Sequence, residues 1–209
     1  MTSLEARFTD DLLSNRSNRA LLERWHRLAL PDAWLVAGCL FQTVWNRRAG
    51  LPAEAQIKDH DLFYFDPADT SEAAERRTQA RVDAAVADLG VPVEAKNQAR
   101  VHLWYEGWFG FPYPPLAGSR DGIDRFLVRA TCVGVRPRGE GIADGLEVYA
   151  PHGLEALYEG RLAPNPRTDH RPLFERKVAS YRERWPWLTV EGAVERSPLH
   201  NTSAPHSSG

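Results

Sequence analysis

The residues of this chain best suited to chemistry are two aspartates one residue apart, Asp59 and Asp61, which open the apolar run 62–65. In an extended strand alternate side chains share a face, so the two carboxylates project together. Ionised carboxylates held close repel each other, and a divalent cation relieves that repulsion. The spacing therefore indicates a metal site, although a solvated strand entrance or a turn has the same pattern.

A second feature lies upstream of the aspartates, where the apolar run 34–37 ends at Gly38-Cys39 and a helical pattern begins. A glycine turn at the start of a helix offers free backbone N–H groups to a phosphate. A phosphate-binding turn followed by metal-binding carboxylates indicates nucleotidyl transfer, which needs an acceptor oxygen, an α-phosphorus and a leaving pyrophosphate held in line.

Apolar periodicity predicts the elements that position these residues. In the first half we expect helices at 4–13 and 17–28, the second capped by Ser17, a strand at 33–37, a helix from 38 to 48, a strand at 62–65 covered on both faces, a helix capped at 69–71 and running to 89, and a strand at 91–95. The segment 97–105 is ambiguous between a helix and an irregular segment.

The second half is richer in turns. We expect an ordered loop at 107–120, a helix at 123–130, a hairpin of strands 131–135 and 146–149, helices at 153–162 and 173–184, and a disordered tail at 193–209. The prediction is an α+β fold, a small mixed β-sheet flanked by helices. It forms one domain over 1–192 with an N-terminal helical extension at 1–30.

Further candidates surround the aspartate pair. A third carboxylate should come from a neighbouring strand, and Glu94 is the best-placed candidate, although an ordinary exposed strand residue fits as well. Three basic residues suit a phosphate tail: Lys58, Lys96 and Arg100. Each of them, taken singly, also fits a solvated or salt-bridged surface group.

Cys39 has two interpretations. A cysteine at a helix N-terminus has a lowered pKa and can act as a nucleophile. No Cys-His-Asp ordering accompanies it, however, and a packed thiol is the simpler interpretation.

Composition limits the function classes. With 43% hydrophobic and 26% charged residues, the 209-residue chain is typical of a soluble globular protein, and its net charge of −2 does not indicate general nucleic-acid binding. The two cysteines form no Cys-x-x-Cys pair, which argues against a disulfide scaffold or a zinc site. No apolar run reaches the length of a membrane span and no signal-peptide core is evident, so we expect a cytoplasmic protein.

Several motifs together resemble a bacterial group of nucleotidyltransferase-like proteins within the DNA polymerase β-like nucleotidyltransferase superfamily. They are Gly38-Cys39, Asp59-x-Asp61, and the runs 97–105, 151–158 and 161–166, and the similarity covers residues 20–190. The resemblance implies a mixed sheet flanked by helices, magnesium dependence and transfer of a nucleoside monophosphate group. By the same resemblance, Gly38 and Cys39 match the phosphate turn, and Asp59 and Asp61 match the metal ligands.

The chain departs from the superfamily pattern at two places. Cys39 stands where glycine or serine is usual, which removes a phosphate-bonding hydroxyl, and the interval between the turn and the aspartates is longer than the common pattern. The leading hypothesis is a Mg²⁺-dependent (or Mn²⁺-dependent) nucleotidyltransferase that uses Asp59, Asp61 and Glu94. It would act on a nucleoside triphosphate and an unidentified acceptor, which could be a small molecule, a protein or an RNA end. The alternative is a non-catalytic nucleotide-binding module on the same fold.

Overall fold

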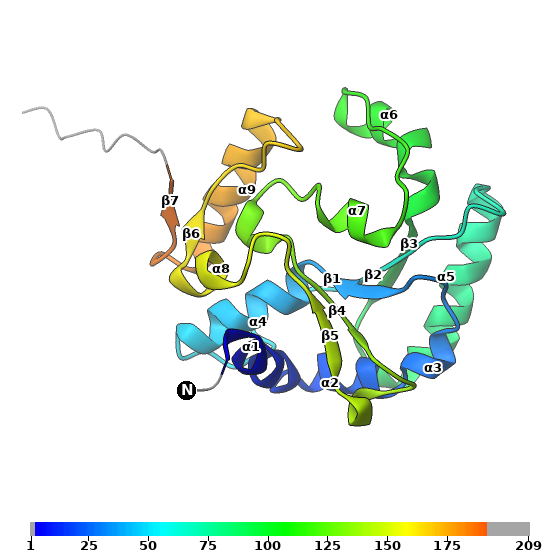
Figure 1. Cartoon of the computed structure of the whole chain (residues 1–209), viewed down its shortest axis with the longest axis horizontal. Coiled ribbons are helices and arrows are strands. Elements are labelled where there is room, and N and C mark those ends of the chain that lie inside the picture. Colours follow the sequence, from blue (N-terminus) through cyan, green and yellow to red (C-terminus); the bar gives the residue numbers. More distant parts are fainter. Residues whose placement is uncertain (1–2, 192–209) are drawn as a thin grey trace, which may run out of the picture.

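The computed structural model describes residues 3–191, and Figure 1 shows their arrangement. The helices are α1 (Leu4–Leu13), α2 (Arg16–Glu23), α3 (Trp25–Leu28), α4 (Gly38–Arg48), α5 (Glu72–Val86), α6 (Tyr105–Phe109), α7 (Ser119–Ile123), α8 (Glu155–Glu159) and α9 (Arg171–Arg184). Short 3₁₀ helices span Ala87–Leu89, Gln98–Leu103, Arg129–Thr131 and Ile142–Asp144. The strands are β1 (Trp34–Val36), β2 (His60–Tyr64), β3 (Val93–Asn97), β4 (Gly134–Pro137), β5 (Leu146–Tyr149), β6 (Arg161–Leu162) and β7 (Thr189–Val190).

Five strands form the central sheet in the order β3-β2-β1-β4-β5. β2 and β3 are parallel, whereas β1 is antiparallel to both β2 and β4, and β4 and β5 form an antiparallel hairpin. The expected small mixed sheet and the hairpin are therefore confirmed. A separate pair of short parallel strands, β6 and β7, lies beside α8 and α9 (Figure 1).

The two faces of the sheet have different surroundings. Leu35, Leu62 and Ala95 belong to the main core, which they share with buried residues of α1, α2, α4 and α5. On the opposite face, Trp34 and Val36 belong to a smaller cluster with Ile123 at the end of α7. Because side chains alternate along a strand, this second face is also the one that carries Asp61 and Phe63.

The N-terminal helices support α4 through buried polar contacts. The Asn18 side-chain amide donates to the Cys39 carbonyl at 2.9 Å, and the Thr43 hydroxyl donates to the same oxygen at 2.7 Å. Asn15 donates to the Thr43 hydroxyl oxygen at 3.0 Å. Asn15 also caps α2, accepting from the backbone N–H groups of residues 17 and 18, so the prediction that Ser17 is the cap was wrong.

The helix predicted at 123–130 is absent. α7 instead ends at Ile123, and the Asn165 side-chain amide donates to the carbonyls of Asp124 (2.7 Å) and Phe126 (2.8 Å). A helix would have used those carbonyls in its own ladder. Val128 then pairs with Pro164 in an isolated β-bridge. The distant Asn165 therefore replaces local helical bonding in this segment.

Two further segments differ from prediction at glycines with positive φ. The helix predicted at 153–162 is confined to α8, because Gly160 (φ +73°) ends it and the next two residues pair with β7. The loop predicted at 107–120 contains the end of α6, which stops before Gly110 (φ +79°), and the start of α7. The tail predicted at 193–209 lies outside the described residues. Within 3–191, every helix is too short or too polar to span a bilayer.

Candidate active site

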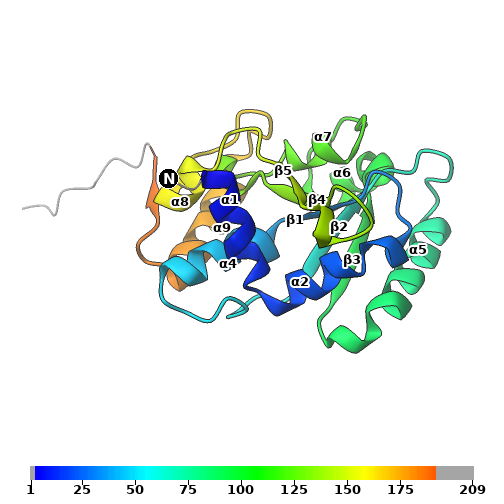
Figure 2. The ribbon, with the colours of Figure 1, turned by 60° about the horizontal axis from the view of Figure 1, so that its bottom comes forward.

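A cavity of about 580 Å³ lies over the face of the sheet that carries Asp61. β2 and the start of α4 form one side of it, and residues of α9 face them. Aromatic residues of α6 and of the segments that flank α7 line the other end. Figure 1 shows α9 and α6 on opposite sides of α7, while Figure 2 shows α5 at the far end of the molecule from α1, α8 and α9.

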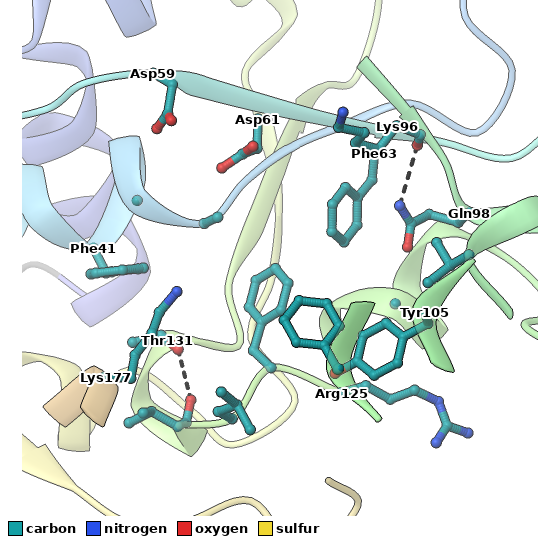
Figure 3. Close-up of a pocket in the computed structure, with 18 of the residues that line it drawn as sticks. Phe41, Asp59, Asp61, Phe63, Lys96, Gln98, Tyr105, Arg125, Thr131 and Lys177 are labelled. Carbon is teal, nitrogen blue, oxygen red and sulfur yellow. Dashed lines mark hydrogen bonds between the residues drawn. The ribbon is translucent and has the colours of Figure 1, made fainter. Parts of the chain in front are cut away.

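The two predicted metal ligands meet at this cavity. Asp59 immediately precedes β2, Asp61 lies within it, and both line the cavity. In Figure 3 the two carboxylates point to the same side of the strand. Asp61 lies opposite Val36 of β1 and opposite Glu94 of β3 in the sheet register. Because β2 is an inner strand of the sheet, the backbone around Asp61 is held on both edges.

The surroundings of Asp61 disfavour its charge. Burial, together with the neighbouring charges of Asp59 and Glu94, raises the pKa of Asp61 to about 6, although the charges of Lys177 and Lys96 act to lower it. A bound cation would favour the ionised carboxylate and offset this cost. The pair therefore has the electrostatic character of a cation site.

The turn between β1 and α4 supplies the other predicted half of the site. Ala37 has φ +62° and ψ −136°, a backbone conformation that is normally left to glycine, and no side chain caps the helix that starts at Gly38. The first N–H groups of a helix have no partner within the helix and suit an anion. Ala37 and Gly38 both line the cavity. The residue with the strained backbone is therefore Ala37, one residue before Gly38, which the sequence indicates as the turn glycine.

Cys39 does not present its thiol to the cavity. Its side chain is buried and its Sγ donates to the carbonyl of Val36 at 3.3 Å. Burial raises the pKa of Cys39 well above its ordinary value, with Asp61 adding to the effect. Of the two interpretations of this cysteine, the structure agrees with the packed thiol. Only the backbone N–H of Cys39 is left to contact a phosphate.

The predicted third carboxylate is close to the pair but lies differently. Glu94 is on the same face of the sheet as Asp61, yet its side chain is about half exposed, at 51%, and forms an ion pair with Lys96 at 3.4 Å. Lys96 lines the cavity, whereas Glu94 does not. Within 3–191, no three His, Cys, Asp or Glu side chains gather closely enough to hold one metal ion.

The other two predicted phosphate ligands lie away from the cavity. Lys58 is exposed and does not line it. Arg100 forms an ion pair with Glu75 of α5 and donates to the carbonyl of Thr70 at 3.1 Å, so its guanidinium holds α5 beside the end of β3. The structure therefore brings together Asp59, Asp61, Gly38 and Lys96, and separates them from Lys58 and Arg100.

The sequence reasoning missed one whole wall of the cavity. Lys177, Ser180 and Arg184 of α9 line it, at helical spacing of three and four residues. Arg125 and Phe126, which follow α7, line it as well. In the sequence, polar residues beside the apolar row of α9 indicate that this helix has a polar face. That pattern does not show which element of the fold the polar face lies opposite.

Comparison with known proteins agrees with this geometry. A model of the nucleotidyltransferase family matches residues 23–190. The chain belongs to the nucleotidyltransferase family. A search of curated proteins found no match. One solved NMR structure, described as revealing a CCA-adding enzyme head domain, is similar with a TM-score of 0.71 and 23% identity, over 88% of this chain and 94% of that one. At this identity the similarity shows the fold.

Proposed function

We propose that this nucleotidyltransferase moves a nucleoside monophosphate group from a nucleoside triphosphate to an acceptor, with Mg²⁺ or Mn²⁺ held by Asp59 and Asp61. One observation carries the proposal: both carboxylates line the same cavity as Ala37 and Gly38, at the start of an uncapped helix. A metal ligand pair and an anion-binding turn are thus within one ligand-sized space. Candidate acceptors are the oxygen atoms of a small molecule, a protein or an RNA end.

The donor set fits Mg²⁺ without a third close carboxylate. This ion keeps several waters and is usually bound through one or two carboxylates together with substrate phosphates. Asp59 and Asp61 would supply the carboxylates, with Glu94 as the nearest candidate for a third acid. When bound, the ion would neutralise charge on the phosphates and lower the pKa of the attacking hydroxyl.

In the proposed reaction the acceptor oxygen forms a bond to the α-phosphorus, and the bond from that phosphorus to the β-phosphate oxygen breaks. Pyrophosphate leaves with the electron pair, and the acceptor proton passes to solvent. Backbone N–H groups at Gly38 and Cys39 would hold phosphate oxygens. Asp61, with a pKa of about 6, would be mostly ionised at neutral pH.

One observation favours the alternative, a module that binds a nucleotide without transferring it. Glu94 is exposed and paired with Lys96 rather than lining the cavity. Such a module would bind nucleotide at the same turn but release no pyrophosphate.

Calorimetry with ATP, CTP, GTP and UTP, each with Mg²⁺ and with EDTA, tests the binding step. We expect Mg²⁺-dependent binding that D59N and D61N weaken strongly. Asp10 provides the matched control, because it is an exposed acid on α1 outside the cavity lining, and D10N should bind like the wild type. No Mg²⁺-dependent binding by the wild type, or unchanged binding by D61N, would refute the metal site.

A screen of acceptors with α-labelled triphosphates then tests transfer. The expected result is labelled product and pyrophosphate with the wild type and D10N, and neither with D61N. Binding without any pyrophosphate release across the screen would favour the binding module.

A further inference from the structure

The cations of the cavity differ in whether they already have partners. Four line it: Lys96, Arg125, Lys177 and Arg184. Lys96 pairs with Glu94 at 3.4 Å, and Arg125 pairs with Asp121 at 3.4 Å. Arg184 donates to Gln42 at 2.8 Å and lies over the Trp185 ring. Lys177 has no ion pair or side-chain hydrogen bond with any residue of 3–191. Its ammonium is therefore the cation still available to a ligand.

α9 fixes the direction of the Lys177 side chain. The buried row of this helix is Phe174, Val178 and Tyr181, and Tyr181 packs edge-on against Phe41 of α4 with ring centroids 5.4 Å apart. Lys177 is one residue before Val178 and four before Tyr181, so it lies on the edge of this packed row. α9 is thereby docked on the same helix whose first turn opens into the cavity.

Lys177 and the aspartates face each other across the cavity. In Figure 3 the Lys177 side chain extends past Phe41 toward the strand that carries Asp59 and Asp61. Its charge lowers the pKa of Asp61 more than the charge of Lys96 does, although Lys96 is on the strand next to Asp61. No ion pair joins Lys177 to Asp61, so the space between ammonium and carboxylates remains open.

The opposite end of the cavity is aromatic. Phe63 and Phe126 contact each other edge to face at 5.6 Å, and Tyr105 and Tyr113 lie 4.2 Å apart, centroid to centroid. All four line the cavity. Rings of this kind accept the flat face of a base. Arg125 also lies at this end, 5.7 Å over the Tyr113 ring, but it is paired with Asp121. The cavity therefore has an aromatic end whose cation is paired and an opposite end where, among residues 3–191, the Lys177 ammonium is unpaired.

We infer that Lys177 contacts the polyphosphate of the bound nucleotide and so sets its orientation, with the phosphates between α4 and α9 and the nucleoside toward the aromatic end. This inference rests on the proposed function, because it assigns the parts of the same substrate. A lysine ammonium is a compact cation with three donors, which suits phosphate oxygens. Lys177 thereby takes the phosphate-binding role that the sequence suggested for Lys58 and Arg100.

The test measures the contribution of the phosphates to binding separately from that of the nucleoside. Calorimetry with Mg²⁺ uses whichever of ATP, CTP, GTP and UTP binds tightest, together with the matching diphosphate, monophosphate and nucleoside. The variants are K177Q, K177R and R176Q. Arg176 is the neighbour of Lys177 on α9, exposed and outside the cavity lining, so R176Q removes the same charge from the same helix.

We expect K177Q to weaken triphosphate binding about tenfold or more, as the loss of a charged hydrogen bond does, while its affinity for the nucleoside stays unchanged. K177R should restore part of the affinity, and R176Q should match the wild type. A K177Q variant that binds triphosphate normally would overturn the inference and leave the proposed function intact. Equal weakening for triphosphate and nucleoside would also overturn it, because it indicates a disturbed fold. A wild type that binds no triphosphate refutes the proposed function instead.

Discussion

Arg184 Nη1 donates a hydrogen bond of 2.8 Å to Gln42 Oε1, which joins the last turn of α9 to the first turns of α4. A Cβ atom at Gly38 would lie 2.5 Å from Gln42 Nε2, so the glycine leaves room for this amide over the helix start. The side chain of Gln42 is thus held at the turn by a residue from the far end of the sequence. Both Gln42 and Arg184 line the cavity.

Removing the Asp61 charge should change how stability depends on pH. The pKa of Asp61 is about 6 in the folded protein and about 3.9 in an unfolded chain, so the folded state binds more protons between these values. Its contribution to the free energy of unfolding therefore falls as pH rises from about 4 through 6, by on the order of 3 kcal/mol. In EDTA, D61N should be more stable than the wild type at pH 8 and equal to it at pH 4.

Urea unfolding of both proteins at pH 4 and pH 8 measures this difference, and D10N should show no such change with pH. Adding Mg²⁺ at pH 8 should stabilise the wild type and not D61N, because only the wild type keeps both ligands. A D61N advantage of the same size at both pH values would contradict the assignment to Asp61 ionisation.

The docking of α9 depends on a buried tryptophan. Trp185 is 1% exposed, donates from Nε1 to Asn46 Oδ1 at 3.0 Å, and packs edge-on against Trp45 at 5.2 Å. W185F should lower the free energy of unfolding by about 2 kcal/mol, through lost packing and a lost hydrogen bond. Trp108 is 80% exposed, so W108F makes the same exchange without those contacts and should leave stability unchanged. Equal effects of the two variants in urea unfolding would contradict this.

The strained turn should be relieved by glycine. Ala37 has φ +62°, which costs on the order of 1–3 kcal/mol in a non-glycine residue. A37G should raise the free energy of unfolding by about 1 kcal/mol after the added chain entropy of glycine is subtracted. Ala49 has an ordinary φ of −81°, and A49G should lower stability by about 0.5 kcal/mol. Thermal unfolding of both variants measures whether each substitution raises or lowers stability. Destabilisation by A37G would show that Ala37 is not strained.

The support beneath the turn is polar and can be tested in the same way. The Thr43 hydroxyl accepts from Asn15 and donates to the Cys39 carbonyl, and all three residues are buried. T43V keeps the shape but leaves a buried amide without its acceptor, which should cost about 1–3 kcal/mol. Thr70 is only partly buried, and T70V is the control that should change stability little. A neutral T43V in urea unfolding would mean that water or another group replaces the lost bond.

The sequence predicted the elements whose patterns are local. The apolar runs around the Gly38 turn and after Asp61 correctly indicated β1, α4 and β2, and the step of two between Asp59 and Asp61 correctly placed both carboxylates on one cavity. A neighbouring strand that carries Glu94 was also expected, although its parallel direction was not predicted. These features follow from periodicities of two and 3.6 residues, which can be recognised within one segment.

The rest depended on contacts between distant segments. Asn165 takes the carbonyls that a helix at 123–130 would have used, and nothing near that segment signals it. The pattern of α9 predicted a helix, but the contact of Tyr181 with Phe41 decides that Lys177 faces the aspartates.

The position of α9 more than a hundred residues after Asp61 also sets the order in which the site is made. A ribosome completes the turn at Gly38 and the carboxylates at 59 and 61 early, whereas the wall that carries Lys177 is among the last described residues. Segments made first can begin to fold while later ones are still being added. Until α9 is synthesised, the nascent chain therefore has its acidic residues without the facing lysine. The proposed contact between Lys177 and a nucleotide can form only after α9 has been synthesised.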